Sequence, residues 1–381
     1  MRETGLTSTK QRIRICFVLS HLPQGGAERQ TINLIRMLDP SQFEVTLVLY
    51  ANQEIFYKEI YNLPVHVISN PAFTKSKLIK NLKGALFLKK VLSQSQFDLI
   101  HTLLFHNGLW VRLLAPGRYT GRIIYSIRNS LEQSSFFERT AEKLLHSRSF
   151  TVTNSHFVLD QYKKIVRGCS GTKCLTIYNG IETDKFKTVE PPNVSNTIVI
   201  GTVGRQTPLK NQIQILRVVK QLNDETSTHT FIIGDNDQGS FYANNDYVKE
   251  NRLEGKVTIM DSQENIEQYY KRFNTFVLSS IYESCPNVLF EAMLARCLCI
   301  VSRGSNKDKF VKDGYNGFEY DGSDWDLLEK LSEAIKIIGS EKAELLQKNA
   351  QDYVSANFSM SKMKDSYIEL YDRLMVVGTK S

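Results

Sequence analysis

Two carboxylates, Glu283 and Glu291, lie in the segment YESCPNVLFEAM, where an apolar run leads into a helical pattern near Pro286. Proline suits the first turn of a helix, because the N–H that it lacks has no partner there. The backbone N–H groups of Asn287 and Val288, together with the helix dipole, are suited to binding a phosphate. Carboxylates beside a bound anion favour neutral partners such as sugar hydroxyls. The segment is therefore a candidate site for a phosphorylated sugar, with two solvated surface acids as the alternative.

A second group of reactive side chains follows the apolar run TIVIGTV. Gly204 and Arg205 begin this loop and Lys210 lies near its end, just before another helical pattern. Arginine offers a planar fork of donors and lysine a mobile point charge, a combination suited to a diphosphate. Gly234 ends the next apolar run, where it allows close approach of a nucleotide. These residues are predicted to bind a diphosphate, with a solvated basic loop as the alternative.

The first half of the chain carries weaker signals of the same kind. Gly25 and Gly26 stand between an apolar run and a helical pattern, where a ligand can approach the backbone. Their spacing is not G-x-G-x-x-G, which argues against a dinucleotide site. His106 follows the run FDLIHTLLF, and Arg128 ends RIIYSIR. For the histidine, sugar binding, proton transfer and a purely structural role all remain open.

The elements that must position these residues follow a simple pattern. Short β-rich runs alternate with longer amphipathic stretches, which is typical of parallel sheets covered by helices, and six strand-like runs can be counted in each half. A chain of 381 residues is long enough for two domains. We therefore predict an α/β protein with two Rossmann-like, doubly wound domains that face each other across a cleft. Ligands are expected beyond the carboxyl ends of the strands.

The domain boundaries follow from composition and periodicity. The polar residues 1–11 are expected to form a flexible tail, and 12–187 the first domain. Two prolines and the loss of periodicity mark 188–196 as a linker, which leads into a second domain over 197–358. Residues 359–381 are helical by periodicity and are expected to return to the first domain.

Composition excludes several classes of protein. Hydrophobic residues at 41% and charged residues at 23% are ordinary globular values. No apolar run is long enough to span a membrane, and the polar start does not resemble a signal sequence, so a cytoplasmic protein is expected. The six cysteines are scattered without the paired spacing of a zinc site, so we expect no metal.

The net charge of +8 is unevenly distributed. Residues 1–185 hold 25 Lys and Arg against 13 Asp and Glu, whereas the remainder holds 23 against 27. No acidic residue occurs over 60–97, where a basic amphipathic helix is predicted. Such a helix suits an anionic membrane surface, with a solvated surface helix as the alternative. The lysines expected to face the membrane or an acceptor are Lys75, Lys77, Lys80, Lys83 and Lys90.

Taken together, these motifs resemble the retaining glycosyltransferases of family 4 (glycosyl transferases group 1) of the bacterial polysaccharide type, which have the GT-B fold. The resemblance covers nearly the whole chain. It rests on GGAER at 25–29, NS at 154–155, IYNGIETDKF at 177–186, GRxxxxKN at 204–211, the Glu-x(7)-Glu pair at 283 and 291, and DGYNGF at 313–318.

The resemblance implies roles for the residues singled out above. Arg205 and Lys210 would contact the phosphates of a nucleotide-sugar donor, Glu283 the hydroxyls of the transferred sugar, and Glu291 the ribose. The expected catalytic residues are Arg205, Lys210 and Glu283. The expected donor-binding residues are Gly25, Gly26, His106, Gly204, Arg205, Lys210, Gly234, Glu283, Pro286, Asn287, Val288 and Glu291. The first domain would be the acceptor side and the second the nucleotide-sugar side.

The resemblance also implies a chemistry. A hexose or N-acetylhexosamine would pass from a nucleotide sugar, with UDP as the favoured base, to a glycan acceptor, with retention and without a metal or other cofactor. If the basic helix binds a membrane, the favoured acceptor is a sugar on a polyprenyl diphosphate or another lipid-linked glycan, used in surface polysaccharide synthesis at the inner face of the cell membrane. Many relatives have a histidine where this chain has Arg128 and Asn129, which leaves open whether Arg128 or His106 contributes to catalysis.

Two rival interpretations remain at this stage. An epimerase of nucleotide sugars or a glycan phosphorylase can have the same fold. A basic nucleic-acid-binding protein is a different class, but the positive charge lacks interleaved aromatic residues and a recognised binding motif, so no nucleic-acid partner is expected.

Overall fold

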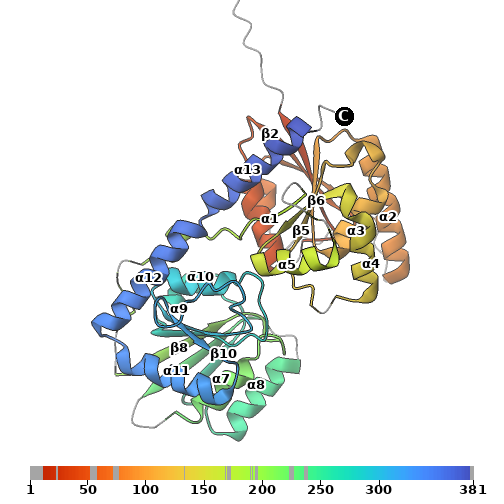
Figure 1. Cartoon of the computed structure of the whole chain (residues 1–381). Coiled ribbons are helices and arrows are strands. Elements are labelled where there is room, and N and C mark those ends of the chain that lie inside the picture. Colours follow the sequence, from red (N-terminus) through yellow and green to blue (C-terminus); the bar gives the residue numbers. More distant parts are fainter. Residues whose placement is uncertain are drawn as a thin grey trace, which may run out of the picture. The chain divides into compact units, whose positions relative to one another are not determined.

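The computed structural model describes residues 12–22, 25–51, 58–71, 77–132, 134–167, 169, 173–188, 190, 192–193, 196–222, 227–235 and 239–377. The chain forms two compact units. The first comprises Met1–Tyr178 together with Met363–Ser381, and the second comprises Asn179–Lys362. Each unit has its own parallel sheet (Figure 1). This confirms the predicted α/β class with two doubly wound domains. The predicted tail at 1–11 lies outside the described residues.

Within the described part of the first unit, seven parallel strands lie in the order β3-β2-β1-β4-β5-β6-β7. Their bounds are Ile13–Leu19 (β1), Phe43–Leu49 (β2), Val65–Ser69 (β3), Leu99–Leu103 (β4), Ile123–Ile127 (β5), Ser149–Thr153 (β6) and Cys174–Thr176 (β7). The central strands are buried almost throughout, because they are covered on both faces. The order reverses between β1 and β4, which is the switch point where such sheets bind ligands.

The helices of the first unit include one from the far end of the chain. Their bounds are Gly26–Met37 (α1), Lys77–Gln94 (α2), Phe105–Leu114 (α3), Phe136–Leu145 (α4), His156–Ile165 (α5) and Met360–Val377 (α13), with short 3-10 turns at Lys58–Asn62, Gly117–Tyr119 and His146–Arg148. Helices α2, α3 and α4 are successive neighbours. The blue helix α13 reaches the first sheet (Figure 1), where the Tyr371 ring meets the Phe43 ring edge-on at 6.1 Å.

Within the described part of the second unit, six parallel strands lie in the order β10-β9-β8-β11-β12-β13. The strands are Ile198–Val203 (β8), Thr228–Ile233 (β9), Val257–Met260 (β10), Thr275–Leu278 (β11), Leu298–Ser302 (β12) and Phe318–Tyr320 (β13). The helices are Thr183–Phe186 (α6), Gln212–Val219 (α7), Gly239–Glu250 (α8), Ile266–Tyr270 (α9), Asn287–Leu294 (α10), Asp324–Ile337 (α11) and Glu341–Asn357 (α12). Here the order reverses between β8 and β11.

The division between the units falls at Asn179, before the expected domain end at residue 187. The reason is a set of contacts that no local pattern reveals. The Asn179 side chain donates to the Cys285 carbonyl at 3.3 Å and to the Asn287 side chain at 2.7 Å, and α6 packs on α9 and α10. At the other end, Ser359 pairs with Ile181 in the second unit, and the chain joins the first unit from Met363.

No helix in the described ranges is long and apolar enough to cross a membrane.

Candidate functional site

The switch point of the second sheet brings together two loops that are far apart in the sequence. Residues 204–211 follow β8 and residues 279–286 follow β11, and these two strands are neighbours. The Ile281 N–H donates to the Leu209 carbonyl at 2.9 Å, and the Ser279 hydroxyl donates to the Lys210 carbonyl at 2.9 Å. The two loops therefore form one connected structure at the carboxyl edge of the sheet, where ligands bind in this class of fold.

An ion pair between Lys210 and Glu283 spans these two loops. The lysine ammonium contacts Oε1 of the glutamate, and the same oxygen accepts a hydrogen bond from the Ser280 hydroxyl at 2.7 Å. Both side chains are largely shielded, with 23% and 13% of their surface exposed. An ammonium has three donors, so Lys210 can contact an anion while it keeps this pair. Two residues that the sequence singled out separately thus lie in direct contact.

Arg205, the other cation of the first loop, is exposed to solvent. It lies directly after Gly204, whose φ of 151° falls in a region that favours glycine. The exposed position leaves the guanidinium accessible to a ligand, but the described contacts do not join it to the Lys210 pair.

Gly204 and Gly234 end neighbouring strands and their backbones approach each other closely. A Cβ atom on Gly234 would overlap the carbonyl oxygen of Gly204. The buried side chain of Gln206 holds the two loops together, because it donates to the Gly234 carbonyl at 3.0 Å and accepts from Asn244 at 3.2 Å. The fold itself therefore requires glycine at position 234. Gln206 was missed by the sequence analysis, since nothing in its local pattern shows that it is buried.

The helix that carries Glu291 begins as expected. Pro286 is the N-cap of α10, and the N–H groups of Leu289 and Phe290 donate to its carbonyl at 3.1 and 3.4 Å. The N–H groups of Asn287 and Val288 precede these bonds and have no acceptor within the helix. These are the two N–H groups that were predicted to bind a phosphate.

Glu291 is held by a buried tyrosine from the preceding helix. The Tyr270 hydroxyl donates to Oε2 of Glu291 at 2.8 Å. Burial, and then the charge of Glu291, raise the pKa of Tyr270 well above its ordinary value, so the hydroxyl keeps its proton and remains a donor. This bond orients the Glu291 carboxylate, which was predicted to contact the ribose of the donor.

The first unit places its predicted residues around its own switch point. Gly25 is the N-cap of α1, after β1, and a Cβ atom there would overlap the Glu28 carboxylate. Gly26 begins the helix. His106 lies in the first turn of α3, after β4, where it is exposed and its ring meets the Phe105 ring at 5.6 Å. The glycines and His106 therefore follow the two strands at which the order reverses.

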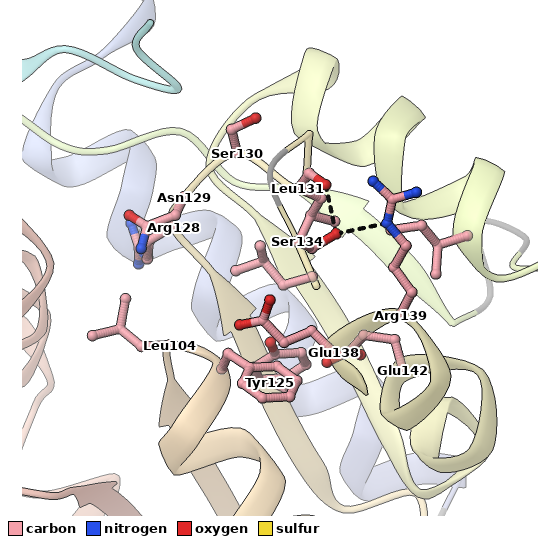
Figure 2. Close-up of a pocket in the computed structure, with 13 residues that line it drawn as sticks. Leu104, Tyr125, Arg128, Asn129, Ser130, Leu131, Ser134, Glu138, Arg139 and Glu142 are labelled. Atoms are coloured by element: carbon pink, nitrogen blue, oxygen red, sulfur yellow. Dashed lines mark hydrogen bonds between the residues drawn. The ribbon is translucent and has the colours of Figure 1, made fainter. Parts of the chain in front are cut away.

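A pocket of about 170 Å³ lies in the first unit, beyond the ends of β4 and β5 and beside α4. Figure 2 shows Arg128 at one side of this pocket and Arg139 at the opposite side. The sequence alone indicates Arg128 and Asn129 as candidate residues but does not indicate the pocket itself. The α4 residues that line the pocket were not predicted as site residues, because the sequence of this helix has the ordinary amphipathic pattern of a surface helix.

The basic helix α2 can be described only in part. Lys75 and the side chains of Lys77 and Lys80 lie outside the described residues. Lys83 and Lys90 are exposed, as predicted for a surface that meets a membrane or an acceptor. Apolar side chains are exposed on the same helix, on its neighbour α3, and on α4, which in turn neighbours α3. They are Leu82, Leu86, Leu113, Phe136, Phe137 and Leu144.

Within the described ranges, no group of three or more His, Cys, Asp or Glu side chains is arranged to hold a metal ion.

Two family models match the chain in succession. Residues 24–185 match the model described as Glycosyltransferase Family 4, and residues 183–353 match the model described as Glycosyl transferases group 1. The two matches together span residues 24–353, which include all the predicted site residues.

Two curated relatives are matched over nearly their full length. One is the UDP-Gal:α-D-GlcNAc-diphosphoundecaprenol α-1,3-galactosyltransferase of Escherichia coli, which is 21% identical over 97% of this chain and 100% of its own. Another, from Campylobacter jejuni, is an α-1,4-N-acetyl-D-galactosaminyltransferase whose named acceptor is a GalNAc-containing glycan on diphosphoundecaprenol. It is 22% identical over 94% of this chain and 98% of its own.

Among solved structures, the Anabaena HepE protein in complex with UDP-glucose resembles this chain in fold. Its TM-score is 0.78 at 19% identity, over 95% of this chain and 100% of its own.

Proposed function

Because this chain belongs to the glycosyltransferases of family 4 and group 1, we propose that it transfers a hexose or N-acetylhexosamine from a UDP-sugar to a glycan carried on a polyprenyl diphosphate. The observation that carries the proposal is the Lys210–Glu283 pair at the switch point of the second sheet. The diphosphoundecaprenol acceptors named for the Escherichia coli and Campylobacter jejuni relatives support this acceptor class. The UDP-glucose bound to the Anabaena protein supports the donor.

The role that we propose for each residue of the candidate site follows from the charge of its side chain. Lys210, Arg205 and the N–H groups at the start of α10 stabilise the departing diphosphate, because they are preorganised donors at the place where negative charge develops. Glu283 accepts hydrogen bonds from hydroxyls of the transferred sugar, and Glu291 from the ribose. The positive groups of the chain take the place of a metal ion in this proposal.

The proposed stereochemical outcome is retention. The leaving phosphate oxygen takes the proton of the acceptor hydroxyl as the new glycosidic bond forms on the face from which the diphosphate departs. No protein nucleophile takes part, so the enzyme contributes positioning and electrostatic stabilisation.

The decisive experiment incubates the chain with UDP-glucose, UDP-galactose and their N-acetyl counterparts, each with a synthetic GlcNAc-diphospholipid acceptor. We expect UDP release that depends on the acceptor, an α-anomeric signal in the product and undiminished rates in EDTA. A β-linked product would refute retention, and loss of activity in EDTA would refute metal independence. Conversion of the donor sugar to its epimer without acceptor would instead favour the rival epimerase.

A thermal-shift comparison of UDP, GDP and ADP tests the base separately. A ligand that binds only the folded state raises the melting temperature, by an amount that grows with its concentration over Kd. We expect UDP to give the largest rise.

We further propose that the chain associates with anionic membranes through the face formed by α2, α3 and α4. Exposed cations and exposed large apolar side chains occur together on these neighbouring helices, a combination that favours the interface of an anionic bilayer. Phe136 is 87% exposed and Phe137 is 63% exposed, which is unusual for phenylalanine in a protein that stays in water. This would place the enzyme at the inner face of the cell membrane, beside its lipid-linked acceptor.

Co-sedimentation with vesicles of phosphatidylglycerol and phosphatidylcholine tests the membrane proposal. The variant Phe136→Ser/Phe137→Ser should bind less, and binding by the unaltered chain should weaken as salt is added. Trp325→Ser is the matched control, because Trp325 is an exposed aromatic residue of the second unit. Equal binding by both variants would rule out this face.

A further inference from the structure

Arg128, at the rim of the pocket in the first unit, is held by the C-terminal helix. It directly follows β5 and is buried, and its Nη2 donates to the Tyr367 hydroxyl at 3.0 Å. Tyr367 belongs to α13 and is itself completely buried. A residue near the end of the chain thus sets the position of a guanidinium on the carboxyl edge of the first sheet.

The Tyr367 hydroxyl is part of a longer hydrogen-bonded chain. It lies 3.5 Å from the Ser126 hydroxyl, which lies 2.9 Å from Nε2 of His101. The other ring nitrogen of His101 lies 3.0 Å from the Tyr371 hydroxyl. Two tyrosines of one helix therefore contact one polar network, but only Tyr367 touches Arg128 through an identified hydrogen bond.

The lining of the pocket indicates what kind of group it accepts. Arg128 and Arg139 supply donors, Glu138 supplies a carboxylate, and Asn129 supplies both donors and an acceptor. Tyr125 also lines the pocket, together with the aliphatic side chains of Leu104, Ile127 and Leu131. A phosphate would meet the unfavourable charge of Glu138. A sugar ring has hydroxyls that both donate and accept hydrogen bonds, and it also has apolar C–H groups. It therefore matches a lining that combines donors, acceptors and apolar side chains.

Arg139 and Glu138 are themselves fixed in place. Nε of Arg139 donates to the Ser134 hydroxyl at 3.1 Å, as the dashed line in Figure 2 shows. Glu138 accepts from the Ser135 N–H at 2.7 Å in a capping box at the start of α4. Preorganised partners of this kind lower the entropic cost of binding.

We propose that this pocket binds a sugar ring of the acceptor glycan, and that Tyr367 is a positioning residue that holds Arg128 for this contact. The inference rests on the proposed function, because it assigns a place to the acceptor of that reaction. It makes the C-terminal helix a determinant of acceptor recognition, although the helix does not line the pocket.

Binding is tested on the full chain without turnover. In the ¹⁵N-labelled protein, the Nε–H signal of Arg128 is identified by its loss in Arg128→Lys. The probes are the methyl α-glycosides of N-acetylglucosamine and of galactose, and inorganic diphosphate, each at millimolar concentration. We expect a glycoside to shift the Arg128 signal. A shift with diphosphate alone, or with none of the probes, would overturn the assignment of a sugar.

The positioning role is tested with a matched pair, Tyr367→Phe and Tyr371→Phe. Each loses one hydroxyl from the same helix and the same network, so their melting temperatures should fall by similar amounts. Tyr367→Phe should raise KM for the acceptor about tenfold, the effect of one hydrogen bond to a charged group, and should displace the Arg128 signal. KM for the donor should not change.

Equal acceptor KM values in the two tyrosine variants would overturn the positioning role. If Tyr367→Phe fails to fold, Arg128→Lys tests the contact that Tyr367 is proposed to position, because it keeps the charge and loses the fork, and an unchanged acceptor KM would then overturn the proposal. Failure of the proposed function is distinguishable, since it would remove UDP binding and transfer in the unaltered chain. If the unaltered chain transfers sugar but no glycoside shifts the Arg128 signal, only the inference about this pocket is refuted.

Discussion

Lys210 and Glu283 form an ion pair although 73 positions separate them in the sequence. They meet because β8 and β11 are adjacent and parallel, so that the loops after both strands emerge at the same edge of the sheet. The pair places a cation and a hydroxyl acceptor side by side. That arrangement suits the proposed binding of a phosphate next to a sugar.

Replacement of Lys210 by alanine should lower kcat about 10²–10³-fold, the usual effect of removing one preorganised donor from a developing negative charge. The folded state should persist, because the two loops keep their backbone hydrogen bond between Ile281 and Leu209. Steady-state kinetics and thermal unfolding measure the two effects. Lys342→Ala, which removes a surface ion pair with Glu333, is the control and should leave kcat unchanged. Turnover near the unaltered level in Lys210→Ala would refute the assignment of the donor site.

Gly234→Ala should destabilise the second unit. Gly234 has a φ of 152°, and the added methyl group would overlap the Gly204 carbonyl. We expect a loss of about 1–3 kcal/mol from overpacking, with weaker UDP binding because the loop after β8 is displaced. Gly255→Ala is the matched control, since open space surrounds that position. Urea unfolding measures both, and equal stability of the two variants would contradict the steric argument.

Glu142→Ala should be among the most damaging substitutions in the first unit. Arg112 and Glu142 form a bidentate ion pair with bonds of 2.8 and 2.7 Å and are almost completely buried. Removal of the carboxylate leaves a buried guanidinium without its partner, which costs about 3–5 kcal/mol. Glu333→Ala breaks a solvent-exposed pair instead and should cost about 0–1 kcal/mol. Chemical denaturation compares the two, and a similar loss in both variants would argue against the buried pair.

The stability of the first unit should depend on pH through His101. Burial, and then the charge of Arg128, lower the pKa of His101 from its ordinary value of 6.5 to about 3. Between these values the unfolded chain binds more protons than the native state, so the free energy of unfolding decreases as the pH falls below 6.5. The limiting slope is about 1.4 kcal/mol per pH unit for this one group.

Urea unfolding at a series of pH values measures this dependence. His101→Gln should flatten the slope between roughly pH 6 and pH 4, whereas His146→Gln, at a more exposed histidine, should keep it. If the slopes of all three proteins coincide, His101 is not the group responsible.

The sequence was sufficient to predict two parallel sheets and the loops that carry the candidate donor site. Strand-like runs followed by Gly204 and by Glu283 indicate carboxyl ends, and the rules of parallel sheets then place those ends at one edge. The roles of the individual site residues remain predictions. Strand β3 was missed, because Val65–Ser69 is a short strand that is only partly buried and lacks the continuous apolar run of its neighbours.

The pocket and the contacts around it could not be predicted in the same way. Arg128 and Tyr367 are 239 positions apart, and neither belongs to a repeating pattern that points to the other. The burial of Gln206 is a similar case, since glutamine is ordinarily a surface residue. Side-chain contacts of this kind depend on tertiary packing, which periodicity does not encode.

The division of the first unit between both ends of the chain has a consequence for biosynthesis. Residues 363–377 supply Tyr367 and Tyr371 to its core, yet the ribosome makes them after the entire second unit. The part of the protein that is translated first must therefore wait for the last helix before its buried polar network is complete. Until α13 has been made, His101 and Arg128 lack the tyrosine hydroxyls with which they form hydrogen bonds in the folded protein.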